Sequence, residues 1–278
     1  SVGLRSRMSG VQITSSAPPL LFMIYPTINP VALDLGFVQI YWYGLMYLMA
    51  FLAAYLLANH RAKQLPDWNT QQTEDMIFYG ALGVVLGGRL GYMLFYNLPN
   101  FLSDPLSIFA IQGGGMSFHG GFLGVLLAMV LFNRKYNKTF FATMDFVAPL
   151  VPLGLGFGRL GNFINGELWG KVTTSPMGMF IQEQGVARYP SQLYEAFLEG
   201  LVLFIILWVF SNKPRPLMSV SALFLIFYGL FRFIIEFVRV PDVQLGYLAF
   251  DWLTMGQLLS LPMIIFGIYL LNKAYKTT

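Results

Sequence analysis

The sequence has no cysteine, only two histidines and few charged residues. Without cysteine the chain can form no disulfide, no thiolate metal site and no cysteine nucleophile of its own. His60 and His119 leave little for a multi-histidine metal centre. Only 11% of the residues are charged, whereas a soluble domain carries about a quarter. The composition therefore excludes a soluble enzyme, a disordered tail and a secreted disulfide scaffold.

Apolar residues dominate the chain. Of its 278 residues, 56% are hydrophobic and 17% aromatic, and the mean hydropathy is +0.61. An apolar run of about 17–25 residues can cross a bilayer as a helix that satisfies its own backbone hydrogen bonds. Seven runs qualify: residues 38–58, 76–97, 116–132, 143–161, 193–210, 219–239 and 253–272. We therefore predict an all-α integral membrane protein with about seven transmembrane helices.

The N-terminal segment differs from the rest of the chain. Residues 1–22 are basic and Ser-rich and lack a long apolar core, so we expect a poorly ordered leader or an artificial extension there. Residues 23–278 are expected to form a single polytopic membrane domain. The net charge of +4 does not indicate nucleic-acid binding, because the basic residues do not cluster on one soluble face.

Basic residues alternate between the loops. They follow the first, third, fifth and seventh predicted spans, and the loops between these contain few. The basic set is Arg61, Lys63, Arg134, Lys135, Lys138, Lys213, Arg215, Lys273 and Lys276. Because short basic loops stay in the cytoplasm, we expect the N-terminus outside and the C-terminus in the cytoplasm. Small-xxx-small steps predict close helix approach at Gly87/Gly91, Gly120/Gly124 and Gly154/Gly158.

Charged residues inside the predicted spans need a physical reason, because a charge in a membrane is expensive. Arg232, Glu236 and Arg239 follow one another at i, i+4 and i+7 in the sixth run, so they share one helix face. One interpretation is a structural ion pair between helices, with Arg239 reaching the outer interface. The other is a cationic pocket for an anionic head group, in which Glu236 holds Arg232 in place.

The end of the fourth run is dense in polar groups. Arg159, Asn162, Asn165 and Glu167 lie within nine residues of one another, among glycines that let the backbone approach a ligand. A helix C-cap followed by a polar turn would explain the glycines and one asparagine. It does not explain an arginine at the membrane boundary. Arginine is the side chain suited to bidentate phosphate binding.

Three further residues fall in the outer half of the predicted bundle. His119 lies among glycines at the start of the third run, where it is either structural or a group that titrates near neutral pH. Tyr43 is either an interfacial aromatic or a site residue. Arg89 either serves the same pocket or pairs with an acid such as Glu195 or Glu199. Unrelated structural polar residues would scatter over both leaflets. These three residues and the polar groups at 159–167 and 232–239 all fall in the outer half instead, which favours a single site.

The segment GRLGNFINGELWG at 158–170 resembles the signature of the prolipoprotein diacylglyceryl transferase family. Five further segments support the resemblance, which extends from about Met23 onward: YWYGLMY at 41–47, GGRLGY at 87–92, FHGG at 118–121, RYPSQLYEA at 188–196 and FYGLFRFIIEFVRVPD at 227–242. The resemblance implies an enzyme of the bacterial inner membrane with its active site towards the periplasmic leaflet. It also implies transfer of the diacylglyceryl group of phosphatidylglycerol to the lipobox cysteine of a prolipoprotein, with glycerol 1-phosphate as the second product.

The resemblance also implies which residues act and that no metal or other cofactor is needed. The expected catalytic residues are His119, Arg159, Arg232, Glu236 and Tyr43, and the expected phosphatidylglycerol-binding residues are Arg159, Asn162, Glu167, Gly170, Arg232 and Arg89. His119 is the first candidate for the base that takes the thiol proton, with Glu236 and Glu167 as rivals. The arginines would stabilise the charge on the leaving phosphate.

Other classes of membrane protein predict different sequence features. A lipid transporter or flippase would also carry charges in a membrane cavity, but should show internal repeats and polar residues in both leaflets. An intramembrane serine protease would need a nucleophilic serine. Ser117 lies two residues from His119, yet no Gly-x-Ser-Gly motif surrounds it. The transferase is therefore the favoured hypothesis and the transporter the alternative.

Overall fold

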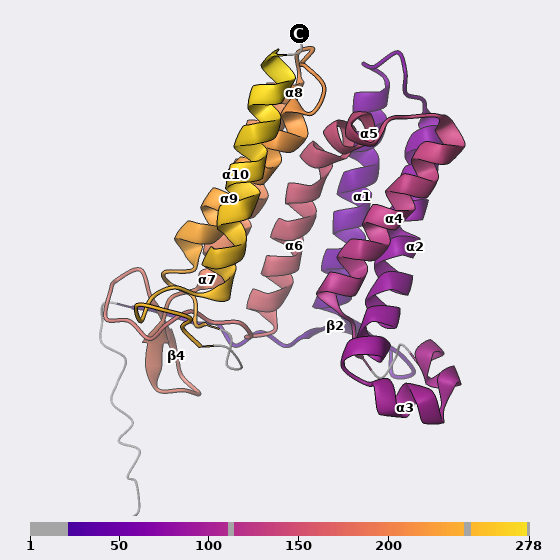
Figure 1. Cartoon of the computed structure of the whole chain (residues 1–278). Helices are drawn as coiled ribbons and strands as arrows, with labels where there is room; N and C mark the ends of the chain where they lie inside the picture. Colours follow the sequence, from indigo (N-terminus) through magenta and orange to yellow (C-terminus); the bar gives the residue numbers. More distant parts are fainter. Residues whose placement is uncertain (1–21, 111–113, 242–245, 277–278) are drawn as a thin grey trace, which may run out of the picture.

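In the computed structural model, the described residues, 22–110, 114–241 and 246–276, form a bundle of helices with two small sheets at one end (Figure 1). All but the last residue of the expected leader, 1–22, lies outside the described residues. Five helical segments are long and apolar enough to cross a membrane, which confirms the membrane character of the chain. They are Trp42–Ala62, Thr70–Phe95, Phe140–Ile164, Ser191–Ser211 and Met255–Lys276.

These segments carry the labels of Figure 1. The first two are α1 and α2, and the last is α10. Two of the segments are composite, and two shorter helices, α3 (Leu98–Ser103) and η1 (Pro105–Phe109), follow α2. The composite segments are made of α5 (Phe140–Val147), η3 (Ala148–Leu150) and α6 (Val151–Ile164), and of α7 (Ser191–Glu195), η4 (Ala196–Val202) and α8 (Leu203–Ser211).

The two other predicted runs are also helical. They correspond to α4 (Phe118–Tyr136) and to α9 (Ser219–Ile235), a shorter apolar helix. Each predicted run therefore overlaps a helix, although among the described residues only five segments meet the length and hydropathy needed for a span. That all seven cross the membrane stays a prediction.

The expectation of an all-α chain is too simple, because the described residues also include short strands. Gln39–Tyr41 (β3) pairs antiparallel with Val31–Asp34 (β2), so α1 begins at Trp42 and four residues of the run predicted at 38–58 are not helical. The run predicted at 219–239 ends as helix at Ile235, because the backbone of Arg239 pairs with that of Gly170. Competing backbone partners thus set both helix ends.

A three-stranded sheet lies at the same end of the bundle as β2 (Figure 1). Its strands are β1 (Met23–Ile24), β4 (Met179–Ile181) and β5 (Val186–Arg188), with β4 in the centre. The Tyr25 hydroxyl, which follows β1, donates to the carbonyls of Phe163 (2.8 Å) and Ile164 (3.2 Å) at the end of α6. Burial raises the pKa of Tyr25, so this hydroxyl stays a donor. The sheet therefore fixes the turn that follows α6.

Glycines let two pairs of helices approach closely. A Cβ atom added at Gly87 of α2 would lie 2.4 Å from the carbonyl oxygen of Gly120 of α4, so only glycine fits there. This contact confirms the predicted approach at Gly87/Gly91 and Gly120/Gly124. At Gly154/Gly158 the approach is looser than predicted, because a Cβ at Gly154 would meet Ala50 of α1 at an ordinary 3.7 Å and one at Gly158 meets no atom within 4 Å. In α6 the close contact is instead made by Gly156, against Gly200 of η4.

Candidate active site

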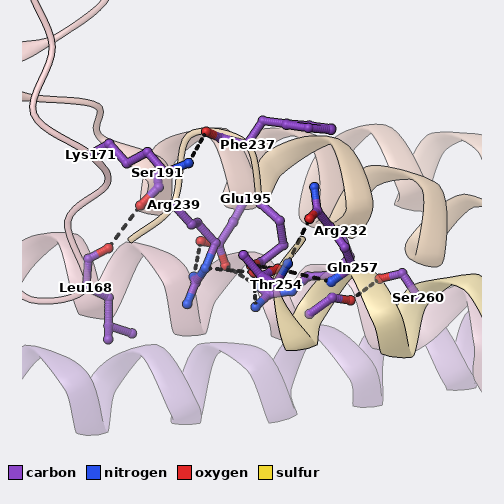
Figure 2. A network of polar contacts seen from close by, with 12 residues as sticks. Leu168, Lys171, Ser191, Glu195, Arg232, Phe237, Arg239, Thr254, Gln257 and Ser260 are labelled. Carbon is purple, nitrogen blue, oxygen red and sulfur yellow. Dashed lines mark hydrogen bonds and ion pairs between the residues drawn. The ribbon is translucent and has the colours of Figure 1, made fainter. Parts of the chain in front are cut away.

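Glu195, at the end of α7, is the centre of a buried group of ion pairs. Its side chain is fully buried, and Oε2 lies 2.6 Å from Nε of Arg159 and 3.4 Å from Nη1 of Arg232. Oε1 accepts a hydrogen bond of 2.5 Å from Nη1 of Arg239 (Figure 2). One carboxylate thus contacts three guanidinium groups that come from α6, from α9 and from the turn after α9.

Glu236 provides the second carboxylate. It caps the C-terminus of α9 and is buried, with Oε1 2.6 Å from Nη2 of Arg232 and 3.1 Å from Nε of Arg239. Oε2 accepts a hydrogen bond of 2.6 Å from the Thr254 hydroxyl. The predicted contact between Glu236 and Arg232 is therefore present. We call the five side chains of Arg159, Glu195, Arg232, Glu236 and Arg239 the charge cluster; it carries one positive charge in excess.

Polar side chains follow Arg159 at the end of α6, where Asn162 lies one helical turn beyond Arg159 and Asn165 is the C-cap. Buried Asn162 donates through Nδ2 to Oε1 of Glu167 (2.9 Å), and Asn165 donates to the same oxygen (3.3 Å). Gln192 of α7 donates to the carbonyl of Glu167. Glu167 is an exposed residue, and both asparagines use Oε1, so within the described residues its second carboxylate oxygen receives no hydrogen bond from them. The predicted helix end and polar turn are both present, and they place Asn162 and Glu167 together.

Gly170 holds the segment that carries Arg239. Its N–H donates to the Tyr189 carbonyl (2.9 Å), and its carbonyl accepts from Nη1 of Arg188 (3.1 Å). A Cβ atom at this position would lie 2.5 Å from the carbonyl oxygen of Val238 and 2.8 Å from that of Tyr189, so only glycine fits. The backbone of Gly170 also pairs with that of Arg239. Lys171 joins the same two segments, since its Nζ donates to the Phe237 carbonyl (2.9 Å; Figure 2).

Tyr43 lies in the first turn of α1 and packs against α6. A Cβ atom at Gly161 would lie 2.8 Å from its ring, so the absence of a side chain at Gly161 makes room for Tyr43. The ring also makes an edge contact with Tyr47, at 5.2 Å between centroids. Tyr43 thus lies beside the helix turn between Arg159 and Asn162.

Within the part of the chain that the structure describes, neither His119 nor Arg89 forms a hydrogen bond or ion pair with the charge cluster. His119 is exposed at the start of α4, and its ring packs edge-on against Phe118 at 5.7 Å. Arg89 is buried and donates to five backbone carbonyls at 2.6–3.1 Å, those of Ser107, Ile108, Ala110, Gly114 and Gly115. Of the two roles expected for Arg89, pairing with Glu195 or Glu199 is therefore wrong, because the guanidinium holds the segment between α2 and α4. Its expected part in phosphatidylglycerol binding stays a prediction.

The sequence analysis did not identify Glu195 as the centre of the charge cluster, or Glu199 as a second buried acid beside it. Both are fully buried in the helix that runs from α7 through η4, and sequence reasoning treated them only as partners for Arg89. Their i, i+4 spacing within an apolar run was a usable signal, because two acids on one face of a membrane helix require cationic neighbours. Within the described ranges, no group of three or more His, Cys, Asp or Glu side chains could hold a metal ion.

Several apolar helices with a buried charge cluster at one end of the bundle define a multi-pass membrane protein with a charged site. Comparison with known proteins narrows this class. Residues 30–273 match the family model of prolipoprotein diacylglyceryl transferase. The chain belongs to this family, as the resemblance of residues 158–170 predicted.

Relatives from several bacteria carry the name phosphatidylglycerol–prolipoprotein diacylglyceryl transferase. The relative from Pseudomonas entomophila is 57% identical over 257 residues, which cover 91% of this chain and 96% of the relative. The relative from Pseudomonas aeruginosa PAO1 is 56% identical over 256 residues, with the same coverage. That from Acinetobacter baumannii is 55% identical over 259 residues, covering 91% and 95%. The predicted class of enzyme, a transferase, is confirmed.

Proposed function

We propose that the chain transfers the diacylglyceryl group of phosphatidylglycerol to the thiol of a lipobox cysteine in prolipoproteins. The products are a thioether-linked lipoprotein precursor and glycerol 1-phosphate, and the reaction is the first step of lipoprotein maturation. The charge cluster supports this proposal, because its excess positive charge at one end of apolar helices suits a lipid phosphodiester. Family membership and the names of the relatives point to the same reaction.

The reaction is a displacement at a glyceryl carbon. The cysteine sulfur forms a bond to that carbon while the carbon–oxygen bond breaks, and the electron pair stays on the phosphate oxygen. Arg159 and Arg232 are assigned to stabilise this growing charge, since fixed cations act strongly in a site shielded from water. The thiol has an ordinary pKa of about 8.5, so most of it is protonated at neutral pH and a base assists.

The other site residues are assigned supporting roles. His119 is the proposed base, and within the described residues it shares no hydrogen bond or ion pair that would compete for its ring. Glu236 already receives two guanidinium groups and the Thr254 hydroxyl, so we assign it to hold Arg232. Asn162 and Glu167 are placed to bind glycerol hydroxyls. Arg89 orders the segment that leads to His119.

Two further residues and the position in the membrane complete the proposal. Tyr43 borders the lipid site beside Arg159, and Gly170 keeps the chain near Arg239 in place. The site is proposed to face the periplasmic leaflet of the bacterial inner membrane, with seven spans in all. The loops after α1, α4 and α8 are basic and lie at the opposite end of the bundle from the sheets (Figure 1), which supports this orientation.

The test is an assay with purified protein, phosphatidylglycerol and a lipobox peptide. We expect glycerol phosphate release and a gain in peptide mass only with a peptide that contains cysteine, not with its Cys→Ser form. We expect Arg159→Ala and Arg232→Ala each to lower kcat about 10²–10³-fold. The matched control is Arg215→Ala, an exposed arginine at the other end of the bundle, which should leave turnover unchanged.

Two outcomes would contradict parts of the proposal. Lipid binding or lipid movement without peptide-dependent release of glycerol phosphate would favour the transporter. Turnover retained in His119→Asn would remove His119 as the base and favour a mechanism dominated by the arginines.

A further inference from the structure

Glu199 is a buried carboxylate to which the proposed mechanism gives no role. It lies on η4, a π-helical turn, and its side chain is fully buried. Among the described residues, neither carboxylate oxygen has a hydrogen-bond partner. A buried ionised carboxylate without hydrogen bonds is strongly unfavourable, and π-helical turns occur frequently at functional sites. Glu199 is therefore a candidate for a group that changes its protonation state.

The elements packed against η4 bring charged groups towards Glu199. These elements are α6, α7, α8 and α9. The ionisable groups that act on Glu199 are Arg159 of α6, Glu195 of α7, Arg232 and Tyr228 of α9, and Arg239 after α9. The α8 segment contributes none, since its sequence LFIILWVFS has no ionisable residue. Glu199 therefore adjoins the charge cluster and no other charged group of these elements.

The balance of charges in this region depends on Glu199. The charge cluster has three arginines and two glutamates, a net charge of +1. An ionised Glu199 brings the total to zero, which suits the site before lipid binds. A lipid phosphodiester adds one negative charge, and the total then returns to zero only if Glu199 is protonated. Uncompensated charge is unfavourable in a buried site. The ionised form of Glu199 therefore suits the lipid-free site, and the protonated form suits the lipid-bound site.

We propose that Glu199 takes up one proton from solvent when the phosphodiester of phosphatidylglycerol binds to the charge cluster. Glu199 is then a positioning residue that adjusts the charge of the site and does not touch the reacting atoms. The inference rests on the proposed function for the identity of the lipid. Because binding consumes a proton, affinity should fall as the pH rises above the range in which free Glu199 ionises.

The experiment measures binding of dihexanoyl phosphatidylglycerol to the detergent-solubilised full chain by calorimetry. Titrations between pH 6 and 9, each in two buffers of different ionisation enthalpy, give Kd and the number of protons taken up. For the unmodified chain we expect uptake of close to one proton and a Kd that rises up to about tenfold per pH unit. Glu199→Gln should bind without proton uptake and with a flat pH profile.

Two further variants separate titration from structure. Glu199→Asp keeps a carboxylate and should restore both proton uptake and the pH profile. Glu183→Gln, at an exposed glutamate near the small sheet, is the matched control and should behave as the unmodified chain. The inference is overturned if the unmodified chain takes up no proton on binding. It is also overturned if Glu199→Gln takes up as many protons as the unmodified chain. If Glu199→Gln does not fold, binding without uptake in Glu199→Asp overturns it equally. A folded unmodified chain that binds no phosphatidylglycerol at any pH contradicts the proposed function instead.

Discussion

At the residue scale, the charges among the apolar helices stabilise one another. Each guanidinium of the charge cluster contacts at least one buried carboxylate, and Glu195 contacts all three. Breaking a buried ion pair by removing one partner is costly, because the other charge is left without compensation. Glu195 is therefore the side chain on which the stability of the cluster depends most.

Neutralising Glu195 should destabilise the protein strongly. Glu195→Gln removes the carboxylate between three arginines, and we expect a loss of about 3–5 kcal/mol in the free energy of unfolding. Thermal unfolding in detergent measures the change. The control is Asp75→Asn, at an ion pair with Lys135 that lies outside the core, where we expect little change. Equal shifts in the two variants would contradict the central role of Glu195.

Individual residues differ in how far the sequence predicts their contacts. The contact between Arg232 and Glu236 follows from i, i+4 spacing on one helix, so the sequence alone was sufficient to predict it. The contacts of Glu195 with Arg159 and Arg239 depend on how three segments pack, which no local pattern encodes. The pairing with an acid that was one alternative for Arg89 is wrong, because its partners are backbone carbonyls. Every residue has a backbone carbonyl, so the sequence does not indicate which ones Arg89 contacts.

At the scale of elements, the apolar runs predicted where the helices lie but not where they end. The cores of the runs follow from hydropathy, which a single sequence carries. The ends depend on backbone partners outside the runs, as with the nearby strand β2 for the start of α1 and the distant Gly170 for the end of α9. The two small sheets were not predicted, because strands of two to four residues leave almost no periodic signal.

The contact between α2 and α4 makes a prediction about these two helices. Gly87→Ala would place a methyl group 2.4 Å from a backbone oxygen of α4, so the helices must separate. We expect a loss of about 1–3 kcal/mol and a lower unfolding temperature. Gly80→Ala is the matched control in the same helix, since its Cβ would only touch the flexible end of Met129 at 3.8 Å. A similar loss in both variants would show that helix separation is not the cause.

At the scale of the whole molecule, the polar elements and the basic loops lie at opposite ends. The sheets and the charge cluster lie near the end of the bundle that carries β4, α3 and α7, and the described C-terminus lies at the other (Figure 1). The positions of the helices were predictable from the sequence. The way in which they bring Arg159, Glu195 and Arg232 together was not, because it depends on helix packing.

The absence of cysteine makes the proposed orientation directly testable. Single cysteines introduced as Glu183→Cys, near the small sheet, and as Lys213→Cys, between α8 and α9, both replace exposed residues. In intact spheroplasts a membrane-impermeant maleimide should label the first variant and not the second. The unmodified chain, which has no thiol, is the blank, and labelling of Lys213→Cys after lysis shows that the site is reactive. Labelling of Lys213→Cys in intact spheroplasts would contradict the orientation.

The parallel pairing of β1 with β4 has a consequence for biogenesis. Met23 is among the first described residues, yet its strand partner Met179 lies well beyond the middle of the chain. A ribosome delivers the chain from its N-terminus, so β1 is made long before β4 exists. The Tyr25 cap on α6 likewise forms only after Phe163 and Ile164 have been inserted. Closure of this sheet therefore marks a late stage of assembly, when the greater part of the chain has already left the translocon.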